Sequence, residues 1–306
     1  MSTGLLEGEG GGLLRTYRYV RVLTLLPAVW LLVAIVAVWV ARRQVLPSIS
    51  DYYGGPLRDV FVGGLMACGL GMVIYVGVSK LEEYALNFAG VNAFFVALIP
   101  NSFKDLLART RSAEAEGVSV ATSSLDLLQN LKIALITFLL VVFAFVVLDF
   151  FVMKWTQFRW SDQSRTANAL IVVSWVLEFS LIGGVIALLL GIEEVGGGSL
   201  FSGVHFAAAA FLVLNLSFAA ASHAWPARLR RLDESTSDTR GAQLGFRLIT
   251  LLMWAGIGLG GSAIFARIPY SVIVTEVVEV VLFCVFWFIA TRSSWKPARR
   301  RTARTT

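Results

Sequence analysis

Long apolar runs separated by short polar segments dominate the pattern along this chain. Eight runs approach the length of about 20 residues that a membrane-spanning helix requires. They cover approximately residues 22–41, 60–79, 84–100, 131–153, 167–191, 200–224, 246–266 and 271–291. Backbone groups in lipid must be paired internally, and the pattern lacks the alternating ten-residue segments of a membrane barrel. It therefore predicts an all-α, polytopic transmembrane helix bundle of about eight spans.

Composition narrows the class of protein further. Hydrophobic residues make up 57% of the 306 residues and charged residues only 15%, whereas a soluble domain has about 25% charged residues. These values exclude a water-soluble enzyme, a disordered chain and a nucleic-acid-binding domain. The net charge is +6, but most of the positive residues flank the apolar runs, so we expect membrane lipid and no nucleic acid as partner.

The basic residues also predict the orientation of the bundle. Lys and Arg accumulate in cytoplasmic loops, and most of them fall on one side of the alternating spans if the N-terminus is cytoplasmic. We therefore expect both termini in the cytoplasm and the chain in the inner, or cell, membrane of a bacterium. Arg42 and Arg43, instead of a cleavage site, follow the first run, which we interpret as a retained span.

The sequence predicts one membrane domain with a tail at each end. Glycine-rich residues 1–14 predict a flexible N-terminal tail, residues 15–292 a single transmembrane helical domain, and residues 293–306 a basic C-terminal tail. The longest loop, about 101–130, is expected to contain a short interfacial helix. Gly256 and Gly260 form a GxxxG pattern, which favours close helix packing within the bundle or, alternatively, an oligomer contact.

Ionisable residues within the apolar runs are the first candidates for function, because charged groups are costly in lipid. Glu178 lies near the middle of the fifth run, and His205 lies about one turn into the sixth. Glu276 and Glu279 are three residues apart in the eighth run and so share one helix face. Each of them can instead be a buried residue paired within the bundle, so the functional interpretation depends on the set.

A second group of polar residues lies in the loop before the second run and at the end of the third. With a cytoplasmic N-terminus, this group, His205, Glu276 and Glu279 all fall in the outer half of the bundle. We therefore predict one outward-facing polar pocket. Its candidate residues are Ser48, Ser50, Asp51, Tyr52, Tyr53, Arg58, Asp59, Asn101, His205, Glu276 and Glu279.

Four segments of the chain carry a family resemblance. These segments, SISDYYGGPLRDVFVGGL, NFAGVNAFFVALIPN, GVHFAAAAFLVLNLSF and TEVVEVVLFCVFW, resemble a group of uncharacterised bacterial multi-pass membrane proteins. The shared positions are Ser48, Ser50, Tyr52, Tyr53, Arg58, Asp59, His205 and Glu276. That group resembles a six-span bundle, so the resemblance implies that about 103–197 adds two helices here. It implies no established activity.

A more distant similarity is to the CREST membrane hydrolases, which hold a zinc ion with a Ser, an Asp and three His. Ser48 or Ser50, Asp51 or Asp59, and His205 match part of that set. The chain has only two His, and His223 is expected near the opposite face. A catalytic zinc takes three protein ligands, for which His205, Asp59 and Glu276 are weak candidates, so we expect no cofactor and keep zinc as the alternative.

Three functions follow as hypotheses. The first is a binding bundle whose pocket holds a lipid headgroup or small amphiphile, with Arg58 as a fork for a phosphate or carboxylate. The second is a metal-dependent membrane lipid hydrolase, and the third is a secondary transporter that uses Glu178, Glu276 and Glu279. Because the nucleophile and phosphate-binding motifs of known enzymes are missing, we favour binding over catalysis.

Overall fold

The structure is a computed structural model that describes residues 3–43, 45–54, 57–152, 163–230, 239–266 and 268–294. Side chains within these ranges are described except at 3–18, 53–54, 149–150, 152, 263–265 and 293–294. The predicted basic tail therefore lies almost wholly outside the described residues, as does the side chain of Tyr53.

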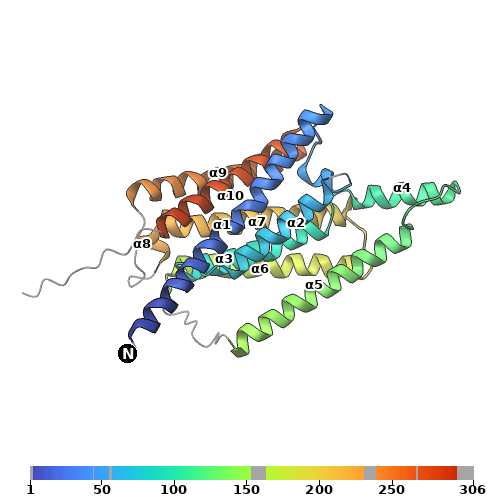
Figure 1. Cartoon of the computed structure of the whole chain (residues 1–306). Coiled ribbons are helices and arrows are strands. Elements are labelled where there is room, and N and C mark those ends of the chain that lie inside the picture. The colour runs from blue at the N-terminus through green and yellow to red at the C-terminus, as the bar shows by residue number, and fades with distance from the viewer. Residues whose placement is uncertain are drawn as a thin grey trace, which may run out of the picture.

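The described residues are helical almost throughout (Figure 1). The long helices are α1 (Thr3–Arg42), α2 (Arg58–Ile74), α3 (Lys80–Leu98), α5 (Ser124–Val152), α6 (Arg165–Leu189), α7 (Leu200–Ala224), α9 (Arg240–Phe265) and α10 (Ser271–Ser294). The short ones are η1 (Ile49–Gly54), α4 (Phe103–Ala115) and α8 (Pro226–Leu229). Strands β1 (Glu194–Val195) and β2 (Gly198–Ser199) pair as a small antiparallel hairpin. The prediction of an all-α bundle is thus confirmed.

Seven helices within the described residues are long and apolar enough to cross a membrane, which makes the chain a multi-pass membrane protein. The sequence predicts about eight spans, and the predicted span that is not among these seven helices is α2. The second apolar run, 60–79, does not stay helical to its end, because α2 has 17 residues and stops at Ile74. Ser79 instead caps the next helix by accepting a hydrogen bond from the Glu82 N–H. The intervening residues form the connection between α2 and α3.

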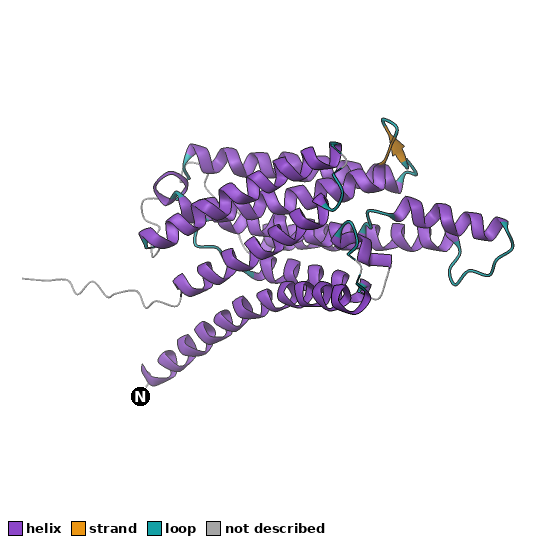
Figure 2. Ribbon diagram, turned by 90° about the horizontal axis from the view of Figure 1, so that it is seen from above, coloured by secondary structure: helices purple, strands orange, loops and turns teal. Residues whose placement is uncertain are grey.

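Successive long helices run in opposite directions, so the connections gather at two ends of the bundle (Figures 1 and 2). We call one the η1 end, where α2, α7 and α10 begin and where η1 and the β hairpin lie. The other is the α8 end. The predicted interfacial helix corresponds to α4, which projects from the η1 end. Helix α1 begins at Thr3 and covers most of the segment expected as a flexible tail, whose flexibility stays a prediction.

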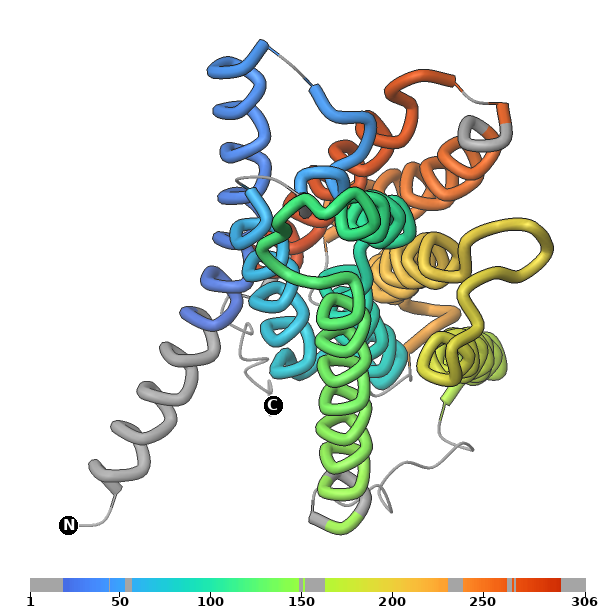
Figure 3. Tube along the Cα trace, turned by 90° about the vertical axis from the view of Figure 1, so that its right-hand side faces the viewer, coloured from blue at the N-terminus to red at the C-terminus, as the bar shows by residue number. Residues whose placement is uncertain are grey.

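Helices α3 and α7 pack along each other at the centre of the bundle, and α5 stands at its edge (Figure 3). The central pair is the most buried, whereas few residues of α5 are buried. Exposed apolar side chains on α1, α5 and α6 are the surface that a bilayer covers. Gly256 and Gly260 of α9 face Glu279 and Thr275 of α10 in the same chain.

Candidate functional site

A cavity of about 410 Å³ lies inside the bundle, between α1, α2, α3, α7, α9 and α10. Helix α10, which lines one side of the cavity, packs mainly on α9 and α1 and only slightly on α7. Lining residues extend over Phe61–Met72, His205–Leu216 and Val272–Phe283. Each of these ranges corresponds to about 16 Å along a helix axis at a rise of 1.5 Å per residue. The cavity is therefore elongated along the bundle and has the size of a small-molecule site.

The polar groups of this cavity gather toward the η1 end. Ser50, His205, Thr275 and Glu276 line that part, and Glu279 lies one helical turn farther along α10 toward the α8 end. Toward the α8 end the lining is almost entirely apolar, with Cys68, Met72, Leu212, Leu216, Val280 and Phe283. The two ends of one cavity thus differ in polarity in the way that the two ends of an amphiphile do.

Glu276 connects α10 to η1. Its carboxylate accepts hydrogen bonds from the Ser48 hydroxyl, at 2.8 and 2.9 Å, and from the Ile49 N–H at 2.6 Å. The Ile273 N–H in the first turn of α10 donates to the carbonyl of Pro47. These contacts place Ser50, whose hydroxyl lies 2.8 Å from that of Ser48, at the polar end of the cavity.

His205 is buried on α7, with 1% of its surface exposed. Its Nδ1 lies 2.6 Å from the carbonyl oxygen of Ile99, at the end of α3. Because a carbonyl oxygen only accepts, Nδ1 carries the hydrogen, and Nε2 of the neutral ring is an acceptor. The Ser202 hydroxyl donates to the carbonyl of Asn101 at 2.8 Å, so the end of α3 is held against the start of α7.

Glu279 lies one helical turn from Glu276 and differs from it in every contact. Its side chain lines the cavity and only 8% of the residue is exposed. Neither carboxylate oxygen has a hydrogen-bond partner among the described residues. Its Oε1 lies directly against Gly256, where an added Cβ would be 1.8 Å away. The cavity therefore contains a buried acceptor that none of the described residues satisfies.

The other predicted pocket residues lie around the cavity or away from it. Tyr52 is buried in η1, where its hydroxyl accepts a long hydrogen bond from the Leu46 N–H. Asp51 is partly buried, which raises the pKa of its carboxyl. Arg58 and Asp59 are exposed in the first turn of α2 and are not among the residues that line the cavity. The prediction that Arg58 binds an anion in this pocket is therefore not supported by the lining of this cavity.

Glu178 belongs to a separate contact in the centre of the bundle. Its carboxylate accepts a hydrogen bond of 2.9 Å from the amide of Asn92 on α3. One turn earlier on α6, the Ser174 hydroxyl donates to the Asn215 side chain of α7 at 2.7 Å. These bonds join α6 to α3 and α7, and none of the four residues is among those that line the cavity.

The metal hypothesis can be compared with the arrangement of its proposed ligands. Across the described part of the chain, no three His, Cys, Asp or Glu side chains lie close enough to hold a metal ion. His205 and Glu276 line one cavity, but Asp59 is exposed on α2. The zinc alternative stays a prediction from the sequence.

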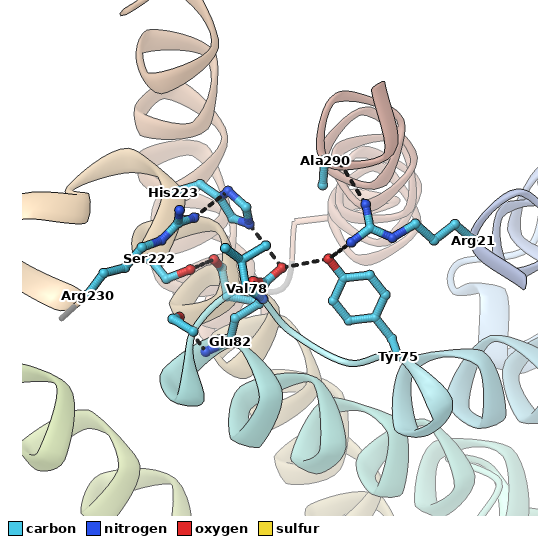
Figure 4. Close-up of polar contacts among 10 residues, drawn as sticks. Arg21, Tyr75, Val78, Glu82, Ser222, His223, Arg230 and Ala290 are labelled. Carbon is cyan, nitrogen blue, oxygen red and sulfur yellow. Dashed lines mark hydrogen bonds and ion pairs between the residues drawn. The ribbon is translucent and has the colours of Figure 1, made fainter. Parts of the chain in front are cut away.

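A second polar cluster, which we did not predict, lies at the α8 end (Figure 4). Glu82 on α3 is fully buried and accepts hydrogen bonds from the Val78 N–H at 2.7 Å and the Tyr75 hydroxyl at 3.1 Å. His223 Nε2 lies 2.9 Å from Glu82, and Arg230 Nη2 lies 2.7 Å from His223 Nδ1. Because Arg only donates, Nδ1 accepts and Nε2–H donates to Glu82.

The cluster continues to α1 and α10 through Arg21. Its guanidinium donates to the Tyr75 hydroxyl and, at 3.1 Å, to the carbonyl of Ala290. The Trp287 indole N–H donates to the carbonyl of Arg21 at 2.7 Å. We call this set the α8-end cluster: Arg21, Tyr75, Glu82, His223, Arg230 and Trp287. It connects helices from both halves of the chain.

The sequence does contain a signal for this cluster. Glu82 precedes the third apolar run, which we bounded at 84–100, and was therefore not among the candidate residues. The Ser79 cap starts α3 earlier and draws Glu82 into the buried face. A Ser followed three residues later by Glu is the pattern of a helix start, and it would have placed Glu82 within the helix.

Comparison with known proteins adds no relative. No protein-family model, curated protein or solved structure matches this chain. The resemblance to a bacterial membrane protein group, and the distant one to CREST hydrolases, therefore stay predictions.

Proposed function

We propose that this protein binds a single-chain amphiphile within the membrane, with the polar head toward the η1 end of the cavity and the chain toward Phe283. The observation that carries the proposal is the division of one elongated cavity into a polar part and an apolar part. Ligand sites are mostly apolar with a few placed polar groups, which is the composition of this lining.

The geometry supports particular roles for the polar residues. His205 is held by Ile99, so its Nε2 has a fixed position as an acceptor for a hydroxyl or amine. Ser50 offers a hydroxyl beside it in the lining. The lining of about 16 Å has to hold the head and the chain together, so the chain is shorter than a dozen carbons. The expected ligand is therefore a lipid-like molecule with one chain and a small head.

Binding is favoured here over the two other hypotheses. The hydrolase needs a metal set that the described residues do not bring together. The transporter was expected to use Glu178 together with Glu276 and Glu279, but Glu178 lies outside the residues that line the cavity. We also propose the inner membrane of a bacterium as the location, on the charge distribution alone.

The test uses decanol as a neutral probe, with the protein in nanodiscs of zwitterionic lipid. A ligand that binds only the folded state raises the unfolding temperature as its concentration rises. We expect this rise for the wild type and its loss in Gly261→Phe, because position 261 lines the cavity and a Cβ there meets open space.

Gly258→Phe is the matched control. This position lies on the same helix, is exposed, and also has nothing within 4 Å of an added Cβ, but it does not line the cavity. The control should keep the decanol response. An equal response to decanol in both variants would contradict the proposed function.

A further inference from the structure

The two carboxyl groups of the cavity are in opposite hydrogen-bonding states. Glu276 is satisfied by the Ser48 hydroxyl and the Ile49 N–H. Glu279 has no partner for either oxygen among the described residues, although it is more than nine-tenths buried. A buried polar group left unpaired costs about 1–3 kcal/mol, and more if it is charged. A ligand that donates a hydrogen bond to such a group removes this cost, so the donor contributes most to binding at this place in the cavity.

The charges around Glu279 determine which kind of ligand head group can donate to it. The described lining contains no Lys or Arg, and its other ionisable groups near the η1 end are Glu276 and His205. Arg58, the cation that the sequence suggested for this pocket, is exposed on α2 outside the lining. An anionic head would therefore meet two acids with no cation, whereas a cationic head would meet a complementary charge.

An ammonium group matches this environment in both charge and hydrogen bonding. It has one positive charge, three donors and no acceptor, while the Glu279 carboxylate offers two unsatisfied acceptor oxygens. Three aromatic side chains, Phe61, Phe206 and Phe283, also line the cavity, and aromatic ring faces attract cations. An alcohol of the same length would use one donor and leave most of the carboxylate unpaired.

We propose that Glu279 binds the ammonium group of a lipophilic amine, whose hydrocarbon chain lies along the apolar part of the cavity. This inference rests on the proposed function and names its ligand class. Gly256 has a positioning role in it, because the absence of a side chain on α9 leaves the space that Oε1 of Glu279 occupies.

The experiment compares decylamine with decanol, two probes of equal chain length, on the full chain in zwitterionic nanodiscs. Affinities are taken from the concentration dependence of the unfolding temperature. The wild type should bind decylamine at least tenfold more tightly than decanol. Glu279→Gln keeps the shape of the side chain but removes its charge, and should bind the two probes equally well.

Two further variants separate this role from a folding effect. Gly256→Ala should also reduce the preference, because its Cβ would displace the carboxyl, which is the flexible end of a side chain. Glu83→Gln removes a partly exposed acid of α3 that pairs with Lys80 and should keep the full preference. Unchanged decanol binding in Glu279→Gln would demonstrate an intact cavity.

Equal binding of both probes by the wild type would overturn the inference, and so would a preference for decylamine that persists in Glu279→Gln. In either case, binding of decanol would still support the proposed function. Failure of both probes to bind would instead remove the proposed function on which the inference rests.

Discussion

Individual buried charges in this protein occur in two kinds of environment. Glu82 is surrounded by donors from Tyr75, Val78 and His223, with Arg230 behind the imidazole. Glu82 is thus satisfied by the protein itself, so the simplest role of the cluster is to hold helices together. Glu279 has no such donors among the described residues, which is expected of a carboxylate whose donor is supplied by a ligand.

The first prediction concerns Glu82. Glu82→Gln should destabilise the protein by about 3 kcal/mol, because breaking a buried ion cluster leaves its cationic members uncompensated. Urea or thermal unfolding in detergent would measure the change.

Glu83→Gln is the matched control, one residue along the same helix. Glu83 pairs with Lys80 at 2.9 Å, with both side chains partly exposed, and surface ion pairs contribute about 0–1 kcal/mol. A loss no larger for Glu82→Gln than for this control would show that the α8-end cluster does not hold the bundle together.

At the scale of elements, α2 and α3 approach each other through facing glycines. A Cβ added at Gly69 would lie 2.8 Å from the carbonyl oxygen of Gly90, and one added at Gly90 would lie 2.6 Å from that of Gly69. Backbone cannot move aside as a flexible side chain can. Small residues at such crossings let helices pack closely in lipid, where the hydrophobic effect does not drive them together.

The second prediction follows from this contact. Gly69→Ala should destabilise the protein by about 1–3 kcal/mol, the usual cost of overpacking, because α2 must move away from α3. Gly63→Ala on the same helix meets nothing within 4 Å and should be neutral or slightly stabilising, since Ala favours helix more than Gly. Thermal unfolding of both variants would check the pair, and equal losses would argue against a tight crossing.

At the scale of the whole molecule, the polar end of the cavity and the α8-end cluster lie at opposite ends of the bundle. The distribution of Lys and Arg predicts that the α8 end faces the cytoplasm. If so, the proposed ligand site lies in the outer half of the membrane, and Arg21 and Arg230 belong to the inner half.

The third prediction tests this orientation with a membrane-impermeant maleimide on intact cells. Val118→Cys, exposed after α4, should be labelled directly, whereas Arg228→Cys, exposed on α8, should be labelled only after permeabilisation. The wild type is the blank, because Cys68 and Cys284 lie within helices of the bundle. The reverse labelling pattern would invert the bundle and move the site to the cytoplasmic half.

Much of the candidate site could be anticipated, but its chemistry could not. Alternation of the spans places His205, Glu276 and Glu279 at one end, because each crossing reverses the chain direction. The alternation of the spans does not determine which side of a helix faces inward. Arg58 and Asp59 were therefore expected in a pocket that they do not line. Glu82 was missed because its burial depends on a cap that extends α3 beyond its apolar run.

The amino-acid sequence by itself determined the helical class, the approximate spans and the need for a bilayer, because backbone pairing and apolar length are local properties. Only the tertiary structure decided which acids are satisfied. Glu276 meets donors 227 and 228 residues away in the chain, and Glu279 meets a glycine on the neighbouring helix. Such contacts depend on how helices rotate and cross, which side-chain packing across the whole bundle sets.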